Sequence, residues 1–171
     1  MADFFLGLTL PEEFEEEVET LRRRFAAPKT APHITLIPPF TWPGTDLELE
    51  QIISESIQGV SPFTIKAQGI GRFGRRVIYI HVELSEELMG LYEKLESGLE
   101  RQGVVEKEKD RSYRPHITLA TRLSPGEFNH YMEELQDYSP SEEFLCQQVA
   151  LFKMTVQGRT RRWQILKQIF F

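Results

Sequence analysis

The same five residues, PHITL, occur twice in this chain, at residues 32–36 and at residues 115–119. The two copies place His33 and His116 83 positions apart in a chain of 171 residues. Chance rarely repeats five residues in so short a chain, so an internal duplication is the better explanation. The repeat therefore predicts a fold of two similar halves.

The segments around the two copies follow the same order. Apolar, β-prone runs at about 3–10 and 77–84 each lead into a segment with helical spacing, at 12–25 and 86–101. Each PHITL is followed by a further helical segment and then by two β-prone segments. In the second half, FLCQQVALFKMTV and RRWQILKQIFF are each expected to form one strand.

The predicted fold class is α+β. We expect two similar lobes related by a pseudo-twofold axis, with two mainly antiparallel sheets, outer helices and a central cleft that carries both H-x-T motifs. Pro38 and Pro39 are expected to end the first motif strand, because proline cannot donate a ladder hydrogen bond. The segment between the lobes has the pattern of a strand rather than of a linker, so residues 1–171 are predicted to form a single domain.

Each motif carries its polar groups on one face of a strand. Residues two apart in a strand point to the same side, so His33 shares a face with Thr35, and His116 with Thr118. If the two faces meet across a cleft, one imidazole can act as general base and the other as general acid near neutral pH. The threonine hydroxyls can donate hydrogen bonds to the oxygens of a phosphate between them. This pairing suits in-line displacement at phosphorus and requires neither a metal nor a cofactor.

A purely structural explanation competes with the catalytic one. A single H-x-T in a strand is usually just a hydrogen-bonded part of the sheet. Duplication would preserve the apolar residues that each core needs, but it would not need to preserve both histidines and both threonines on the outward face. Their presence in both copies favours a paired site.

Composition narrows the class of protein and of partner. The single cysteine, Cys146, cannot form an internal disulfide, which fits a reducing compartment and predicts a cytoplasmic location. No stretch approaches the roughly 20 apolar residues of a membrane span, and the N-terminal apolar run does not fit a signal peptide. A net charge of -6 disfavours nonspecific binding of long nucleic acid. A phosphate-bearing partner is therefore expected to be a small nucleotide or an RNA end, and neither a membrane nor an obligatory protein partner is implied.

The stretches PHITLIPPF and RPHITLATRL resemble the two H-x-T/S-x signatures of the 2H phosphoesterase superfamily, in particular its branch similar to bacterial 2′-5′ RNA ligases. The resemblance covers nearly the whole chain, because the size and the duplicated, bilobal fold of that family also match. It implies metal-independent opening of a 2′,3′-cyclic phosphate, at an RNA end or on a nucleotide, to leave a 2′-phosphate.

The resemblance also implies roles for the four motif residues. His116 would be the base that activates water, and His33 would protonate the departing 3′ oxygen. Thr35 and Thr118 would hold the phosphoryl oxygens and stabilise charge in the transition state.

Four further residues are candidates for substrate binding: Phe40, Tyr113, Arg114 and Arg122. Phe40 follows the first motif and would either stack on a base or cap the core. Tyr113 and Arg114 precede the second motif and would touch phosphate or base. Relatives usually carry an arginine two residues after the second H-x-T-L, whereas Arg122 lies three residues after it; strand parity would still place Arg122 on the face of His116.

Two basic segments, residues 72–76 and 159–162, are expected to be solvated hairpin turns that could also flank an RNA end. Three other functions stay open. RNA ligation to a 2′-5′ linkage would use the same site in reverse and would need a second RNA end. A noncatalytic module for an RNA end or nucleotide would keep the cleft, although pure binding needs no acid–base pair. A binder of an unrelated metabolite would show no dependence on phosphate.

Overall fold

The structure is a computed structural model and describes residues 2–25, 30–106 and 112–171. Its strands are β1 (Phe4–Thr9), β2 (His33–Phe40), β3 (Phe63–Phe73), β4 (Val77–Val82), β5 (His116–Ala120), β6 (Ser141–Cys146), β7 (Gln148–Gln157) and β8 (Thr160–Phe170). Its helices are α1 (Glu12–Arg24), α2 (Asp46–Ser56), α3 (Glu86–Arg101) and α4 (Pro125–Glu134). The predicted α+β class is confirmed, and none of the helices in these ranges is long and apolar enough to cross a membrane.

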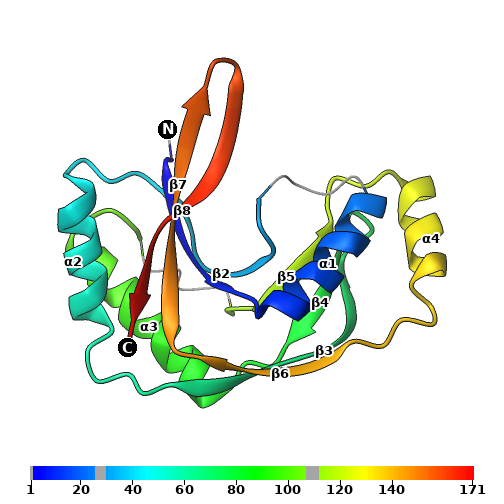
Figure 1. Cartoon of the computed structure of the whole chain (residues 1–171), viewed down its shortest axis with the longest axis horizontal. Coiled ribbons are helices and arrows are strands. Elements are labelled where there is room, and N and C mark those ends of the chain that lie inside the picture. Colours follow the sequence, from blue (N-terminus) through cyan, green and yellow to red (C-terminus); the bar gives the residue numbers. More distant parts are fainter. Residues whose placement is uncertain (1, 26–29, 107–111) are drawn as a thin grey trace.

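All eight strands of the described chain lie in one antiparallel sheet, in the order β6-β3-β4-β5-β2-β1-β7-β8. The prediction of two separate sheets is therefore wrong. The motif strands β2 and β5 pair at Ile34 and Ile117 and so join two groups of four strands (Figure 1). Both isoleucines are fully buried, so the hydrophobic core continues across the junction. We call β2-β1-β7-β8 the His33 half and β5-β4-β3-β6 the His116 half.

The helices that follow β1 and β4 each cross to the other half of the sheet. α1 follows β1 of the His33 half but contacts β5, and α3 follows β4 of the His116 half but contacts β2 and α2. An ion pair of 3.4 Å between Arg24 and Glu134 fixes α1 to α4, and the ring of Phe25 lies 4.6 Å from that of Tyr131. Figure 1 accordingly shows α1 and α4 together on one side and α2 and α3 together on the other.

The helices begin where their sequences favour capping. Thr45 and Glu48 form a capping box at α2, and Ser124 and Glu127 form another at α4. Ser85 caps α3 by accepting a hydrogen bond from the backbone of Leu88.

The first motif strand does not end at its prolines. β2 continues through Pro38 and Pro39 to Phe40, which contradicts the prediction. Its register with β1 shifts there, because Phe4 pairs with Phe40 whereas Leu6 pairs with Ile37. The resulting bulge leaves both prolines outside the regular pairs, where a missing N–H costs no ladder hydrogen bond.

The segment FLCQQVALFKMTV is two strands rather than the one that was predicted. β6 ends at Cys146 and β7 begins at Gln148. β6 pairs with β3 in the His116 half, whereas β7 pairs with β1 and β8 in the His33 half. The chain therefore passes from one half to the other at Gln147, which one regular strand could not do.

Candidate active site

β2 and β5 bring the two motifs together at the centre of the sheet. Their antiparallel pairing at Ile34 and Ile117 sets His33 opposite Thr118, and Thr35 opposite His116. Opposite residues have Cβ atoms about 5 Å apart, and diagonal neighbours such as the two histidines are about 7 to 8 Å apart. Each histidine therefore faces the threonine of the other motif.

Two cavities adjoin this cluster. The first, which we call the Arg22 cavity, has a volume of about 230 Å³ and is lined by Arg22, Thr30, Pro32, His33, Thr118 and Thr121. The second, the Tyr113 cavity, has a volume of about 600 Å³, and its lining includes Thr35, Tyr113, Arg114 and His116. The cavities divide the four motif residues into the same two cross-strand pairs that the register predicts.

Both imidazoles are held by the same local contact. His33 Nδ1 lies 2.7 Å from the carbonyl oxygen of Ala31, and His116 Nδ1 lies 2.7 Å from that of Arg114. A carbonyl oxygen can only accept, so Nδ1 is the protonated nitrogen of each neutral ring and Nε2 carries the lone pair. In a neutral ring, Nε2 can then accept a proton. Once the ring is protonated, Nε2 can donate one.

Aromatic rings on neighbouring strands flank His33. Its ring centroid lies 5.0 Å from that of Phe5 on β1 and 5.3 Å from that of Phe152 on β7. Gly7 leaves room beside the ring, because a Cβ at Gly7 would lie 2.8 Å from the carbonyl oxygen of Ile34 and 3.6 Å from His33 Cδ2. Any larger residue at position 7 would therefore press on the motif strand.

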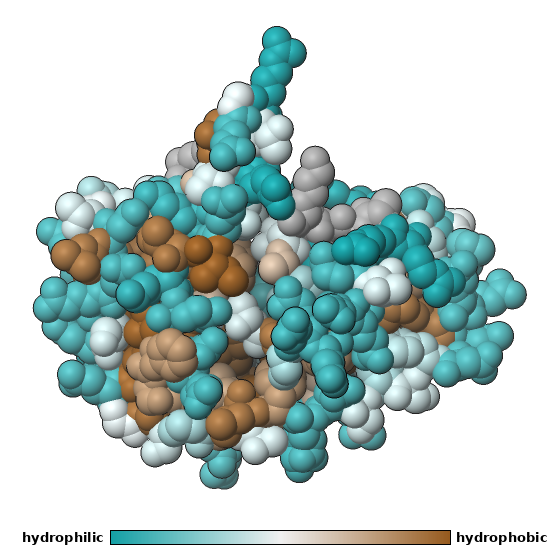
Figure 2. All heavy atoms as spheres, viewed as in Figure 1, coloured by the Kyte–Doolittle hydropathy of each residue, from teal (hydrophilic) through white to brown (hydrophobic). Residues whose placement is uncertain are grey.

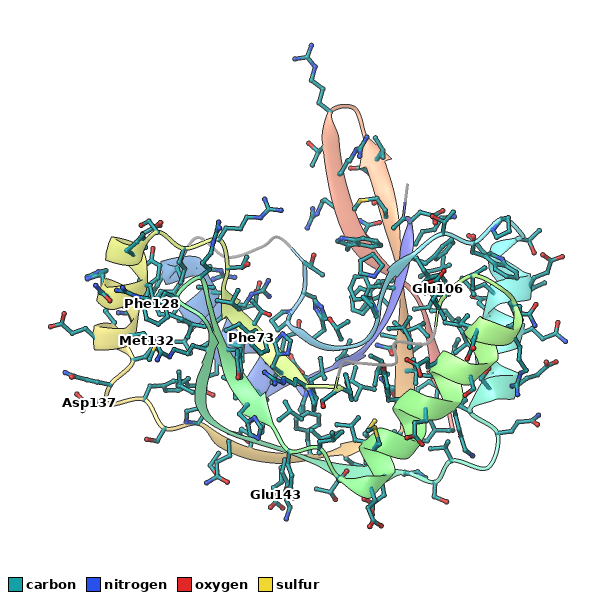
Figure 3. The ribbon with its side chains drawn as sticks, turned by 180° about the vertical axis from the view of Figure 1, so that it is seen from behind. Phe73, Glu106, Phe128, Met132, Asp137 and Glu143 are labelled. Carbon is teal, nitrogen blue, oxygen red and sulfur yellow. The ribbon has the colours of Figure 1, made fainter. Side chains whose placement is uncertain are left out.

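His116 has a matching environment in its own half. Its ring centroid lies 4.9 Å from that of Phe73 on β3 and 5.1 Å from that of Tyr79 on β4. Figure 3 shows Phe73 toward the middle of the molecule, whereas Glu106, which lines the Tyr113 cavity, lies on the side of α3. The aromatic neighbours restrict both imidazoles to a narrow range of orientations.

Burial and nearby charge keep the imidazoles neutral in the free protein. Burial lowers the pKa of His33 below its ordinary value, although its hydrogen bond to Ala31 raises it, and the charges of Arg22 and His116 lower the pKa further. Burial also lowers the pKa of His116, against the opposing effect of its hydrogen bond to Arg114. The charge of Arg22 thus opposes protonation of His33 in particular. A phosphate anion between the rings would raise both pKa values.

Arg22 is the functional candidate that the motif analysis does not find. It lies on α1 with 4% of its surface exposed, and it lines the same cavity as His33 and Thr118. An ion pair of 3.0 Å joins its Nη1 to Glu19. A signal exists in the sequence, because Phe14, Val18 and Arg22 recur at four-residue spacing along the buried face of α1. An arginine at the third position of an apolar stripe indicates that this face ends at a polar site.

The structure places the four predicted substrate-binding residues differently from one another. Tyr113 and Arg114 line the Tyr113 cavity beside His116. The Tyr113 hydroxyl donates a 2.7 Å hydrogen bond to the carbonyl oxygen of Thr35, so its observed contact positions the motif strand. Phe40 is 5% exposed and stacks on Phe4 with centroids 6.2 Å apart, so it packs in the core, and it also lines the Tyr113 cavity.

Arg122 lies outside the regular part of β5. The strand ends at Ala120, and Arg122 has a φ of 56°, so strand parity does not extend to it. Its side chain is exposed, whereas the neighbouring Thr121 lines the Arg22 cavity. Within the described residues, no three His, Cys, Asp or Glu side chains come together as a metal site.

Comparisons with known proteins show the family of this chain. The family model of the 2′-5′ RNA ligase superfamily matches residues 10–158. A protein of Staphylococcus saprophyticus is 28% identical over 169 residues, which cover 95% of this chain and 96% of that protein. A protein of Bacillus cytotoxicus is 29% identical over 160 residues, 88% of this chain and 86% of that one. Both carry the name "Putative phosphoesterase".

Solved structures share the fold. The crystal structure of E. coli LigT complexed with 3′-AMP matches with a TM-score of 0.73 over 99% of this chain and 97% of LigT, at 20% sequence identity. Because the family model covers most of the chain, this protein belongs to the 2′-5′ RNA ligase superfamily, a superfamily of 2H phosphoesterases.

Proposed function

We propose that this protein hydrolyses a 2′,3′-cyclic phosphate, at an RNA end or on a nucleotide, to a 2′-phosphate. The observation that carries the proposal is the pair of imidazoles on adjacent strands, each with its Nδ1 on a carbonyl oxygen and each opposite a threonine. E. coli LigT has been solved with 3′-AMP and with phosphate, which supports a nucleotide phosphate as the class of ligand.

The proposed reaction uses one histidine as base and the other as acid. The neutral ring takes a proton from water as the water oxygen attacks phosphorus, and the bond between phosphorus and O3′ breaks. The protonated ring gives its proton to O3′, so one water is consumed and the two histidines exchange protonation states. Thr35 and Thr118 donate hydrogen bonds to the nonbridging oxygens, and Arg22 offsets the charge that develops on them.

The charges around the site favour one order of roles. The family resemblance gives His116 the role of base and His33 that of acid. In the free protein, however, the charge of Arg22 lowers the pKa of His33. Because this charge favours a neutral His33, it favours His33 as the base and His116 as the acid.

The direct test is turnover in the presence of EDTA. Purified protein is incubated with 2′,3′-cyclic mononucleotides and with a short RNA that ends in a cyclic phosphate, and the product is identified by phosphorus NMR. We expect a 2′-phosphate, and we expect His33→Ala and His116→Ala each to lower kcat by about 10²- to 10⁴-fold, the usual contribution of a general acid or base. His130→Ala is the matched control, because His130 is exposed on α4 and its Nε2 lies 3.3 Å from Glu134.

Two outcomes would end this proposal: no turnover of any of these substrates, or turnover that both active-site variants retain. Adding an RNA with a 5′-hydroxyl end to the same assay tests 2′-5′ ligation, in which the 5′-hydroxyl attacks phosphorus in place of water at the same histidines. A joined product in place of the 2′-phosphate would make ligation the function.

We also propose that the two halves arose by duplication and act as one domain over residues 1–171. Three correspondences support this: the repeated PHITL, the identical Nδ1 contacts of 2.7 Å, and a pair of aromatic rings beside each imidazole.

A further inference from the structure

The β7–β8 hairpin extends beyond the body of the protein. Figure 1 shows its two strands rising clear of the other elements, and Figure 2 shows a hydrophilic tip on this projection. An isolated two-stranded ribbon is at best marginally stable in water, so a long projecting hairpin calls for a function.

One face of this hairpin continues the wall of the active site. Phe152 of β7 stacks on Phe5 at 4.3 Å and lies beside His33. The side chains that lie on the same face of the hairpin as Phe152 therefore point toward the site. Residues paired across strands share a face. The hairpin pairs then assign six side chains to this inner face: Phe152 with Ile165, Met154 with Trp163, and Val156 with Arg161.

Along β7 the inner face becomes more exposed with distance from the histidine. Phe152 is 1% exposed, Met154 is half-buried and Val156 is 61% exposed, and Ile165, beside Phe152 on β8, is 42% exposed. Trp163 is partly buried, with its ring against Phe5 at 4.8 Å. An apolar strip that leaves the active site and ends in solvent is typical of a surface that is covered by a binding partner.

Positive charge stands at the outer end of this strip. Arg161 lies on the inner face and Arg159 in the turn, and both are exposed in a chain whose net charge is -6; we call these two the tip arginines. Arg162 pairs with Thr155 and therefore lies on the outer face. The other basic turn differs, because Arg72 and Arg75 lie 5.7 Å and 5.8 Å from the ring of Phe128 on α4.

Arg75 also donates a 2.8 Å hydrogen bond to Asn129, so that turn is packed onto a helix. The two basic turns that the sequence treats alike therefore have different surroundings. The arginines of the β7–β8 hairpin are the ones that stand on a projecting element.

We propose that the inner face of the β7–β8 hairpin binds single-stranded RNA next to its 3′ end, with Trp163 stacking on a base and the tip arginines binding phosphates. Aromatic rings combined with cations are the groups that bind single strands without reading their sequence. This inference rests on the proposed function, because it places the terminal cyclic phosphate between His33 and His116. From Phe152 to Val156 a strand rises about 13 Å, which is enough for two or three nucleotides.

The experiment compares substrates of different length. kcat/KM is measured for a 2′,3′-cyclic mononucleotide and for di-, tetra- and octanucleotides with the same end. We expect kcat/KM to rise from one to about four nucleotides and then level off. Val156→Glu should lower the ratio of kcat/KM for the tetranucleotide to kcat/KM for the mononucleotide by about tenfold. This decrease is within the range expected from the loss of one stacked base. Gln164→Glu is the matched control, because its pairing with Lys153 places it on the outer face of the same ribbon, and its ratio should equal that of the parent.

A binding measurement separates this inference from the proposed function. The chain has two tryptophans, so Trp42→Phe leaves Trp163 as the sole reporter of fluorescence. RNA octamers with a cyclic phosphate should quench Trp163 far more than the mononucleotide does. Quenching without turnover would support the hairpin surface and overturn the hydrolase.

Three results would overturn the hairpin surface. These are a length-independent kcat/KM, equal effects of Val156→Glu and Gln164→Glu, or Trp163 fluorescence that responds to a second copy of the chain at rising protein concentration but not to RNA.

Discussion

Arg22 brings a buried guanidinium to the cavity that also holds His33 and Thr118. A cation in that position does two things at once. It can bind a nonbridging phosphate oxygen, and it lowers the pKa of His33 in the free protein. In the proposed mechanism, the charge of this one side chain therefore connects phosphate binding with the protonation state of His33.

Replacing Arg22 by glutamine should move one side of the pH profile. Because the Arg22 charge lowers the pKa of His33, its loss raises that pKa. If His33 is the base, the acidic limb of the kcat/KM profile moves to higher pH; if His33 is the acid, the alkaline limb moves to higher pH. The pH profile of kcat/KM on a cyclic mononucleotide distinguishes the two.

Arg23→Gln is the control for this prediction, because Arg23 is the exposed neighbour on α1. We expect its profile to match the parent. A fall in activity of Arg22→Gln without movement of either limb would show that Arg22 supports the fold alone. Arg22→Lys, which keeps the charge, should leave the limbs in place.

At the scale of single residues, the sequence indicates the four motif positions because parity places each histidine and threonine on one strand face. The sequence indicates Arg22 less directly than the motif residues, because α1 follows the first strand of one half and places this arginine against β5 of the other half. The aromatic neighbours of the histidines, such as Phe5 and Phe152, also come from strands that are distant in sequence. Side chains that meet only through strand order leave no local pattern.

β1 and β2 approach closely where Gly7 faces the first motif. Gly7→Ala should lower kcat/KM, because its Cβ would lie 2.8 Å from the Ile34 carbonyl oxygen and would displace the strand that carries His33. We expect a loss of about 1 to 3 kcal/mol in the free energy of unfolding, as for other overpacked sites, measured by urea denaturation.

Gly90→Ala provides the opposite control. Gly90 lies within α3, and nothing lies within 4 Å of a Cβ placed there. This change should raise the free energy of unfolding by up to about 1 kcal/mol through helix propensity, with kcat/KM unchanged. If Gly7→Ala keeps full activity, the close approach of the two strands does not position His33.

At the scale of elements, local signals are sufficient for the helices and insufficient for two of the strands. Capping residues such as Ser85 and Ser124 define helix starts on their own. The continuation of β2 through Pro38 depends on a bulge against β1, and the break at Gln147 depends on two different partner strands. Both depend on pairing between distant segments, which a propensity argument does not include.

The whole molecule should lose stability as the pH falls below neutrality. Burial lowers the pKa of both His33 and His116, so the folded chain favours the neutral rings more than the unfolded chain does. That stabilisation is present above the unfolded pKa of about 6.5 and is lost as the pH falls through the lower folded values. The urea concentration at the midpoint of unfolding should therefore decrease as the pH is lowered from 7.5 to 5.

A double variant isolates the contribution of the two active-site histidines. His33→Gln with His116→Gln should show a shallower fall over the same pH range. The control, His130→Gln, removes a histidine that is exposed on α4, whereas His81 is unsuitable because it pairs with His116 across β4 and β5. Equal slopes for the double variant and this control would contradict the account of half-buried, neutral imidazoles.

At the scale of the whole molecule, the α+β class follows from the alternation of β-prone and helical segments, and the duplicated halves remain a prediction that the matched histidine contacts support. The number of sheets does not follow from this alternation. Two lobes with separate sheets and two lobes with one continuous sheet have the same local sequence pattern, because the difference lies in the pairing of Ile34 with Ile117.

The strand order also affects how this protein is made. A ribosome delivers β1 and β2 early, but it delivers β7 and β8, which complete their half of the sheet, only after the other strands that the structure describes. Until then β1 is an open edge, and Phe5 lacks the Phe152 ring that stacks on it. A chain that ends before residue 148 therefore carries both histidine motifs without all of the surroundings that hold them, and the site is complete only after β7 and β8 have been made.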